Sequence, residues 1–329
     1  MTLIRQEKQK LLDRDIEFQV VAATDRSGGA YAPTGLNLET LERTKANTGK
    51  VASYPQFGRA DLSVSEMLSK VKAEVLVELT ESDIRTGQPG VENISRAFER
   101  GLDVVTTNKG ALAVDYNYLT QLASMNHLAL KFRGAAYATI PCIDLNTFRV
   151  FRDQIRAVQV IVNATSNYVL TQMSRGLTKE QALERAQSEG IAERDSSLDI
   201  GGWDTACKLV ILSNFLFDAH VSLDDVVVRS LDEVTSKEAL ESQANGYVIK
   251  PMGELLLENA RVHLTASPKR IPLDSLMASV AGFEKAIAFD TAEGELFFKT
   301  EWAGATPSAC AILRDLIDVR NERVLALGR

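Results

Sequence analysis

The sequence predicts an α/β protein with two parts: a parallel sheet covered by helices on both faces, and a second domain of the α+β class. Two observations carry this prediction. Short buried strands alternate with helices of about ten residues through the first 135 residues, a pattern typical of a parallel sheet. Around Pro141 the alternation stops and longer, differently spaced strands and helices follow.

The first part opens with a charged helix over residues 1–14, LIRQEKQKLLDR, and a strand over 18–25, FQVVAATD, of β-branched and small residues. Gly28 and Gly29 follow that strand and indicate a turn. The next predicted elements are helix 63–71, strand 73–80, helix 90–101 (ended by Gly101), strand 103–108, helix 114–126 and strand 128–135.

The second part begins with a predicted helix over 142–152 and a strand over 155–164. A polar loop then leads into WDTACKLVILSNFL, an apolar pattern that indicates a buried helix from 203. A strand over 291–302 and a helix over 305–319 close the chain. We therefore expect a first domain over 1–136, a second over 137–303, and a final segment over 304–329 that returns to the first.

Composition excludes several classes of function. The chain has 329 residues and a formal net charge of −7, whereas nucleic-acid binding requires a basic face. No apolar run approaches the roughly 20 residues of a membrane span, and the N-terminus lacks the apolar core of a signal peptide. The scattered cysteines favour reduced thiols in a cytoplasm, and the widely spaced histidines argue against a metal site: Cys142, Cys207, Cys310, His127, His220, His263.

The most informative segment is EGIAERDSSLDIGGWDTACKLVILSN, residues 189–214. Several carboxylates precede Lys208, and Asp204 lies four residues before it, on the same face of the predicted helix. Such a set can bind a small zwitterion, because carboxylates bind an ammonium group and a lysine binds a carboxylate or a reacting oxygen. The alternative is a solvated acidic loop with one structural ion pair.

This segment resembles the signature of homoserine dehydrogenases, G-Y-A-E-x-D-P-x-x-D-x-x-G-x-D-x-x-x-K. Ser196 stands where that family usually has proline. VVTTNKGAL (104–112), VNATSNYVL (162–170) and VELTESDIRTGQPG (77–90) resemble further family segments, so the likeness extends over essentially the whole chain. The matching signature positions are Gly190, Ala192, Glu193, Asp195, Asp199, Gly202, Asp204 and Lys208.

The resemblance implies NAD(P)-dependent interconversion of L-homoserine and L-aspartate 4-semialdehyde. It implies that Glu193 and Asp199 hold the ammonium group of the amino acid, and that Lys208 binds the reacting hydroxyl with Asp204 positioning it. Lys109 is a second candidate for proton transfer and for substrate binding, and the sequence does not decide between the two lysines. Asn163 and Thr165 complete the implied substrate-binding set.

The resemblance also implies a Rossmann-like first domain, in which ligands bind at the carboxyl ends of the strands. Asp25 favours NAD through the ribose 2′-hydroxyl, whereas Arg26 suits the 2′-phosphate of NADP. A turn or cap role for Asp25 is the alternative. The remaining residues expected at the cofactor are Thr80, Glu81, Ser82, Thr107, Asn108, Lys109 and Gly304.

One expected part of the cofactor site has no counterpart in the sequence. A dinucleotide domain opens with a strand and G-x-G-x-x-G, and neither precedes residues 1–14 here. That strand is central in such a sheet, so its loss should leave a gap between unpaired strand edges. We therefore expect weak binding of NAD or NADP.

Other departures from the family pattern lie near the same cleft. Thr139, Val160, Ala164 and Trp302 occupy positions where the family has glycine, and each removes room or backbone freedom. Arg133 replaces a glutamate that helps bind a monovalent cation, so we expect no metal site. Lys285 and Ala286 occupy the positions of an Asn-Ala pair.

Two alternatives to the dehydrogenase remain open at this point. One is a non-catalytic or truncated paralogue that binds an amino acid without the dinucleotide, and the other is a reductase of a related amino-acid aldehyde. We also expect a homodimer formed mainly by the second domain, because the strands near 155–162 and 293–300 are apolar and must be covered.

Overall fold

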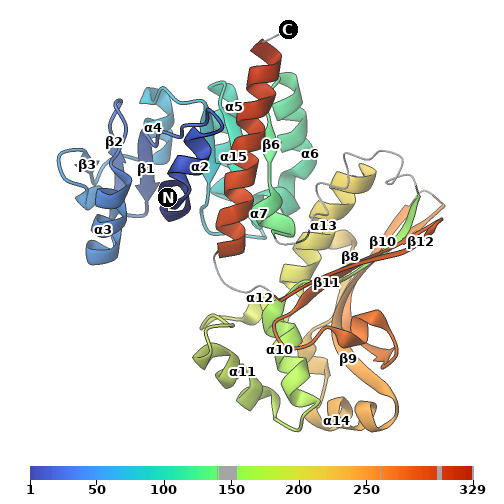
Figure 1. Ribbon diagram of the computed structural model, residues 1–329. Helices are drawn as coiled ribbons and strands as arrows, with labels where there is room; N and C mark the ends of the chain where they lie inside the picture. Colours follow the sequence, from blue (N-terminus) through green and yellow to red (C-terminus); the bar gives the residue numbers. More distant parts are fainter. Residues whose placement is uncertain (139, 141–153, 260, 302–305, 328–329) are drawn as a thin grey trace.

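The computed structural model describes residues 1–138, 140, 154–259, 261–301 and 306–327, and it confirms the α/β class (Figure 1). The N-terminal half contains α1 (Thr2–Gln6), α2 (Lys8–Leu12), β1 (Ala22–Asp25), β2 (Gly28–Tyr31), α3 (Leu38–Thr48), η1 (Val51–Ser53), β3 (Gly58–Arg59), α4 (Val64–Lys70), β4 (Val75–Glu78), α5 (Gly90–Glu99), β5 (Asp103–Thr106), α6 (Lys109–Met125), β6 (Leu130–Lys131) and α7 (Arg133–Ala136).

The rest of the described chain surrounds one large sheet. Its elements are β7 (Ile155–Ile161), α10 (Ala164–Met173), α11 (Lys179–Ser188), α12 (Ser197–Ile200), α13 (Trp203–Phe217), η2 (Leu223–Asp225), β8 (Val226–Val228), η3 (Leu231–Glu233), α14 (Ser236–Ala244), β9 (Tyr247–Glu258), β10 (Arg261–Pro272), η4 (Leu276–Ser279), β11 (Lys285–Thr291), β12 (Gly294–Thr300) and α15 (Thr306–Leu327).

The parallel sheet has the order β4-β5-β6 and is covered on both faces. Successive residues of a strand point to opposite faces, and the two clusters show this directly. Val104 packs in the cluster that includes residues of α5 and α6, while its neighbour Val105 packs with Leu316 and Val319 of α15. The final helix therefore covers one face of this sheet, and α5 and α6 cover the other.

Strand β1 does not join that sheet. It pairs antiparallel with β2, and β2 pairs with β3, so Ala22–Asp25, the only part of the strand predicted over 18–25 that forms one, belongs to a separate three-stranded sheet. Among the described strands, β4 pairs only with β5. A cavity of about 1850 Å³ lies between β1 and β4, which confirms the expected gap between strand edges.

The second sheet has six strands in the order β12-β11-β7-β9-β10-β8. Its longest pairing is the β9–β10 hairpin, which is antiparallel over twelve residue pairs. Val158, Leu255 and Leu264 pack in the same apolar cluster as Leu209 and Leu212 of α13, so this helix lies against the sheet. The helix that carries Lys208 is thus fixed by the core of the second part.

Several predicted boundaries were wrong. Only Leu130–Lys131 of the strand predicted over 128–135 is a strand, and α7 replaces its end. The reason is a competing bond, since the Arg133 N–H donates to the Asp315 carboxylate at 3.0 Å and not to a neighbouring strand. Gly28 and Gly29 lie in β2, after a turn at Arg26 and Ser27.

Helix boundaries also shifted. The helix predicted over 114–126 begins at Lys109, because the Asn108 side chain caps it by accepting from the Ala111 N–H at 3.0 Å. The charged helix predicted over 1–14 is divided at Glu7 into α1 and α2. The helix predicted over 142–152, Cys142, Thr139, Trp302 and Gly304 lie outside the described residues. No described helix is both long enough and apolar enough to span a bilayer.

Candidate active site

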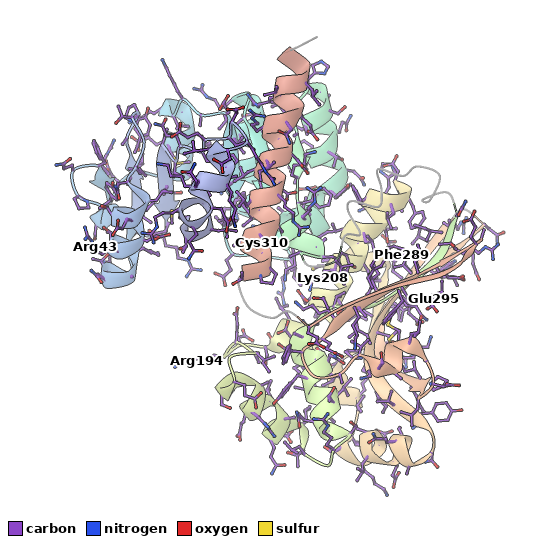
Figure 2. All side chains as sticks on the ribbon, in the orientation of Figure 1. Arg43, Arg194, Lys208, Phe289, Glu295 and Cys310 are labelled. Carbon is purple, nitrogen blue, oxygen red and sulfur yellow. The ribbon has the colours of Figure 1, made fainter. Side chains whose placement is uncertain are left out.

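Three helices begin around one buried carboxylate, that of Asp204 in the first turn of α13. Lys109 is the first residue of α6, and Asn163 caps α10 through the Ser166 N–H at 2.9 Å. Gly202 precedes α13 with a positive φ of 83°, a conformation that glycine adopts without strain. Figure 2 shows Lys208, one turn into α13, where the two halves of the molecule meet.

Asp204 is clamped between two lysines. One of its carboxylate oxygens accepts from Lys109 Nζ at 2.5 Å, and the other accepts from Lys208 Nζ at 2.7 Å. Lys208 Nζ also donates to the carbonyl oxygen of Val162 at 2.9 Å. The exposed fractions are 9% for Asp204, 11% for Lys208 and 34% for Lys109, so only Lys109 has substantial access to solvent.

Burial and charge act against each other in this cluster. Burial by itself would raise the pKa of Asp204, but the ammonium groups of Lys208 and Lys109 outweigh it and hold that pKa well below its usual range. Burial would likewise lower the pKa of Lys109, but attraction to the Asp204 carboxylate outweighs it and raises that pKa. The carboxylate is therefore ionised and Lys109 is protonated at neutral pH.

Asn163 joins this cluster to the acidic loop. Its amide nitrogen donates to the Asp199 carboxylate at 2.6 Å and to Asp204 at 2.9 Å. Asp199 is further anchored by its backbone, since its carbonyl oxygen accepts from the Ser166 hydroxyl at 2.7 Å. Thr165 lies beside the same loop, and its hydroxyl donates to the carbonyl oxygen of Ile191 at 3.4 Å.

Glu193 is not part of this cluster. It is exposed, and its backbone carbonyl accepts from the Gln187 amide at 3.2 Å, while no bond of its carboxylate to another described residue is seen. The structure thus brings together Lys208, Lys109 and Asp204 with Asn163 and Asp199, and leaves Glu193 at the rim of the loop.

Five of the residues predicted at the cofactor line the large cavity between β1 and β4. They are Asp25, Arg26, Thr80, Glu81 and Ser82. Asp25 also has a structural role, because its carboxylate accepts from the Ser27 N–H at 2.8 Å, from the Val51 N–H at 3.0 Å and from Lys45. Burial opposes its ionisation, yet Lys45 and Ser27 hold the pKa of Asp25 well below its usual range.

Short contacts connect the cavity to the lysine cluster. The Lys109 N–H donates to the Ser82 hydroxyl at 3.0 Å, and Ser82 lines the cavity. The Asn108 amide donates to the Thr80 hydroxyl at 3.1 Å. Thr107, the residue before Asn108, donates its N–H to the carbonyl oxygen of Glu78 at 3.2 Å. The cavity wall is therefore bonded directly to Lys109, the residue that carries one of the ammonium groups.

Only part of this cavity fits a dinucleotide. Asp25 is an ionised acceptor at the end of β1, as a ribose hydroxyl requires, and the ends of β4 and β5 lie beside it. The pyrophosphate requires backbone N–H groups at a strand–glycine–helix junction, and no described segment supplies that junction between β1 and β4. The residues present fit the ribose but not the pyrophosphate.

Two residues of the candidate site, Lys285 and Glu78, were not assigned to it from the sequence. Lys285, at the start of β11, interacts electrostatically with Lys208, Asp204 and Asp199, and burial with repulsion from Lys208 lowers its pKa to about 8. Its only signal was the replacement of an asparagine. Glu78 is buried under the end of β4 and accepts from the Thr80 N–H and from Asn93 at 2.7 and 2.9 Å.

The expected absence of a cation site remains a prediction. Arg133 forms ion pairs with Asp315 and Asp318 of α15, at 2.5 and 2.7 Å. The part of the chain that the structure describes contains no group of three or more His, Cys, Asp or Glu side chains placed to hold a metal ion.

The comparisons with known proteins agree with this geometry. A model of the homoserine dehydrogenase family matches residues 141–317. The chain is 35% identical over 307 residues to the homoserine dehydrogenase of Methanocaldococcus jannaschii, with 93% of this chain and 90% of that protein aligned. This chain belongs to the homoserine dehydrogenase family.

Two further homoserine dehydrogenases extend the likeness. The chain is 31% identical to the NAD(+)-dependent homoserine dehydrogenase of Pseudomonas canavaninivorans, with 92% of this chain and 87% of that protein aligned. The crystal structure of a homoserine dehydrogenase from Thiobacillus denitrificans superposes with a TM-score of 0.81 at 26% identity, covering 97% of this chain and 69% of that one. These matches favour neither the non-catalytic paralogue nor the related aldehyde reductase.

The clamped carboxylate leads to a stability prediction. Asp204→Asn should lower the free energy of unfolding by about 3 kcal/mol at pH 7, because it leaves the buried Lys208 ammonium without a counter-ion. The folded-state pKa of Asp204 is depressed, so its stabilisation is complete above the unfolded pKa of about 4 and disappears as the pH falls through the folded value. Urea unfolding from pH 7 to pH 4 and below measures both effects.

Asp195→Asn is the matched control. Asp195 lies in the same loop but is exposed, and its carboxylate accepts from the Ser197 N–H at 3.1 Å. Its substitution should change the unfolding free energy little. Equal losses of unfolding free energy for the two variants would contradict the pairing of Asp204 with the two lysines. A loss for Asp204→Asn that does not shrink in acid would contradict it as well.

Proposed function

We propose that this chain interconverts L-homoserine and L-aspartate 4-semialdehyde with NAD or NADP. The observation that carries the proposal is the Lys109–Asp204–Lys208 cluster beside the cavity that contains the predicted cofactor residues. The proposed domains are 1–136 for the dinucleotide, 137–303 for the substrate and dimer contacts, and 304–329 as a returning segment.

Lys208 is the proposed ligand of the reacting hydroxyl. Two of its three ammonium N–H groups bond to Asp204 and to the carbonyl oxygen of Val162. Both partners are fixed in buried structure, so the third N–H has a defined direction and can donate to the C4 oxygen of the substrate. Asp204 acts through Lys208 and is proposed as a positioning residue.

The amino-acid end of homoserine needs acceptors for its ammonium group. Asp199 is proposed to supply one, since Asn163 and Ser166 hold it in place. Glu193 is exposed at the rim of the same loop, so it can turn towards a bound ligand without losing a bond seen in the structure. Asn163 and Thr165 complete the proposed substrate site.

Oxidation of homoserine also releases a proton. Two lysines of the proposed site, Lys109 and Lys285, have pKa values shifted in opposite directions. Lys109 is held protonated by Asp204, which opposes its use as a base. Lys285, with a pKa of about 8, is neutral in a substantial fraction of molecules slightly above neutral pH. NAD or NADP accepts the hydride when bound, and Asp25 and Arg26 are proposed to select between them.

Substitution of Lys208 tests the catalytic assignment. Lys208→Ala should lower kcat by about 10²–10⁴-fold, the usual contribution of a group that handles the reacting proton. Lys208→Arg should not restore kcat, because the planar guanidinium cannot occupy the place of a compact ammonium between Asp204 and Val162. Steady-state kinetics of homoserine oxidation, with a melting curve for each variant, measure both expectations.

Glu193→Gln is the companion variant with a different expected signature. It should raise the KM for homoserine with little change in kcat, because ammonium binding is the same in the ground and transition states. If Lys208 is only the ion-pair partner of Asp204, Lys208→Ala will lose stability yet keep a near-normal kcat. That result in a folded variant would end the catalytic assignment.

The cavity fits a ribose but not a pyrophosphate, and this predicts weak binding of the nucleotide. The chain should bind NADH and NADPH weakly, with Kd above about 100 μM, because no described segment cradles the pyrophosphate. Calorimetric titration with each nucleotide measures the affinity. A Kd in the low micromolar range for either would show that the glycine loop is dispensable.

A homodimer through the second domain is proposed as well, and β12 is the strand that supports it. Strand β7 lies inside the six-stranded sheet and its apolar face is covered by α13. Strand β12 is an open edge on which Leu296 is 40% exposed. Light scattering at micromolar concentration should give twice the chain mass of 36.1 kDa, and a monomer would refute the proposal.

A further inference from the structure

Lys285 is a half-buried lysine on the face of the six-stranded sheet that α13 covers. Two residues further along β11, Ile287 packs in the same apolar cluster as Leu209 of α13, whereas Ala286 packs in the cluster on the opposite face of the sheet. Successive side chains of a strand point to opposite faces, so Lys285 shares the face of Ile287. Its side chain therefore lies on the side of the helix that carries Lys208.

The pairing of β11 with β7 places Lys285 beside the residue that anchors Lys208. Ala286 pairs with Ile161, so the antiparallel register sets Lys285 opposite Val162, the first residue after β7. The carbonyl oxygen of Val162 accepts from Lys208 Nζ at 2.9 Å. Burial and then repulsion from Lys208 lower the pKa of Lys285 to about 8, as expected for neighbouring ammonium groups.

The charges around this position do not balance. Asp204 binds both Lys109 and Lys208, at 2.5 and 2.7 Å, so one carboxylate already serves two ammonium groups. Lys285 is attracted by Asp204 and Asp199, yet it forms no ion pair with any residue that the structure describes. The protonated cluster therefore contains three ammonium groups and two carboxylates, and a bound anion would neutralise the excess positive charge.

Asp199 supplies a group of opposite charge near Lys285. One of its carboxylate oxygens accepts from the Asn163 amide at 2.6 Å, and the other accepts no hydrogen bond from the described residues. Asp199 and Lys285 attract each other without forming an ion pair. The structure thus presents a carboxylate oxygen and an ammonium group that are both available, which is the arrangement that binds the two charges of an amino acid.

The other cations around the acidic loop are less suited to a carboxylate ligand. Lys109 and Lys208 are both bonded to Asp204. Arg194, the arginine of the acidic loop, is exposed and lies well away from Lys208 (Figure 2). Lys285 is therefore the cation of the described site that has all its donors free for a ligand.

We propose that Lys285 binds the α-carboxylate of the amino-acid substrate, opposite the ammonium site at Asp199, and so restricts the protein to substrates with a free carboxylate. The inference rests on the proposed function, which supplies the amino acid. With the hydroxyl of homoserine on Lys208, each polar group of the substrate meets a different side chain. A bound carboxylate favours the protonated form of Lys285, so a carboxylate ligand and a catalytic base give different results when Lys285 is replaced.

The test compares L-homoserine with L-homoserine amide, which lacks the carboxylate charge. The full chain is melted with increasing concentrations of each ligand at about pH 6.5, where both α-amino groups are protonated. The rise in melting temperature gives the Kd, even for weak ligands. L-homoserine should bind about 10–100-fold more tightly than its amide, because only the acid forms a charge-assisted hydrogen bond with Lys285.

Two substitutions of Lys285 assign the preference to this residue. Lys285→Asn should weaken binding of L-homoserine by about 10–100-fold and change binding of the amide by less than about threefold. Lys285→Arg should keep L-homoserine binding within about fivefold of the original, because a guanidinium also binds a carboxylate. Lys269→Asn is the matched control, since Lys269 is exposed on β10 and pairs with Glu254 at 2.6 Å, and it should change neither affinity.

Kinetics of homoserine oxidation provide a second measurement. Lys285→Asn should raise the KM for homoserine by about 10–100-fold with kcat within about threefold of the original, and Lys285→Arg should restore the KM. A large fall in kcat with unchanged KM in both variants would make Lys285 the base and overturn the proposal. A base could not be replaced by arginine, which stays protonated.

Three binding results would also overturn the proposal: equal affinity for the acid and the amide, equal affinity of the original chain and folded Lys285→Asn for homoserine, or no effect of about 50 mM homoserine on the melting temperature. Failure of the dehydrogenase has a different signature. In that case the original chain would not turn over homoserine with NAD or NADP, while the preference for the free carboxylate and its loss in Lys285→Asn would persist.

Discussion

The carboxylate of Asp204 is the constraint on which the arrangement of the molecule depends. It bonds Lys109 on α6, which belongs to the parallel-sheet half, and Lys208 on α13, which packs on the six-stranded sheet. Asn163 adds a third connection at the start of α10. A single buried anion therefore fixes the relative positions of three helix N-termini, and the same carboxylate that orients Lys208 also joins the two halves of the fold through Lys109.

Features that depend on residues close together in the sequence were predicted well, because the spacing of those residues determines them. The i, i+4 spacing of Asp204 and Lys208 and the alternation of strands and helices follow from periodicity alone. The Lys109–Asp204 bond joins residues 95 positions apart, and no periodic pattern contains it. The end of the strand predicted over 128–135 failed for the same reason, since the Asp315 carboxylate that captures the Arg133 N–H lies 182 positions away.

Of two charge departures from the family pattern, one is compensated by residues far away in the sequence and one is not. Arg133 replaces a glutamate, and α15 supplies Asp315 and Asp318 to neutralise it. Lys285 replaces an asparagine, and no ion pair neutralises it among the described residues; burial and Lys208 lower its pKa instead. The first replacement is therefore tied to the packing of α15, whereas the second changes the charge of the proposed substrate site.

The cavity between β1 and β4 separates the two strand ends that carry the proposed cofactor residues. In an uninterrupted sheet, the strand ends that hold a dinucleotide are aligned by the backbone bonds of the strand between them. Among the described residues, the exposed Arg26 pairs with Glu81 across the cavity, and Lys45 of α3 pairs with Asp25 on the β1 side. Exposed ion pairs contribute little and adapt easily, so the two walls of the cavity are held less firmly than the lysine cluster beside them. The lysine cluster is the more firmly held part of the proposed site, because its ion pairs are buried.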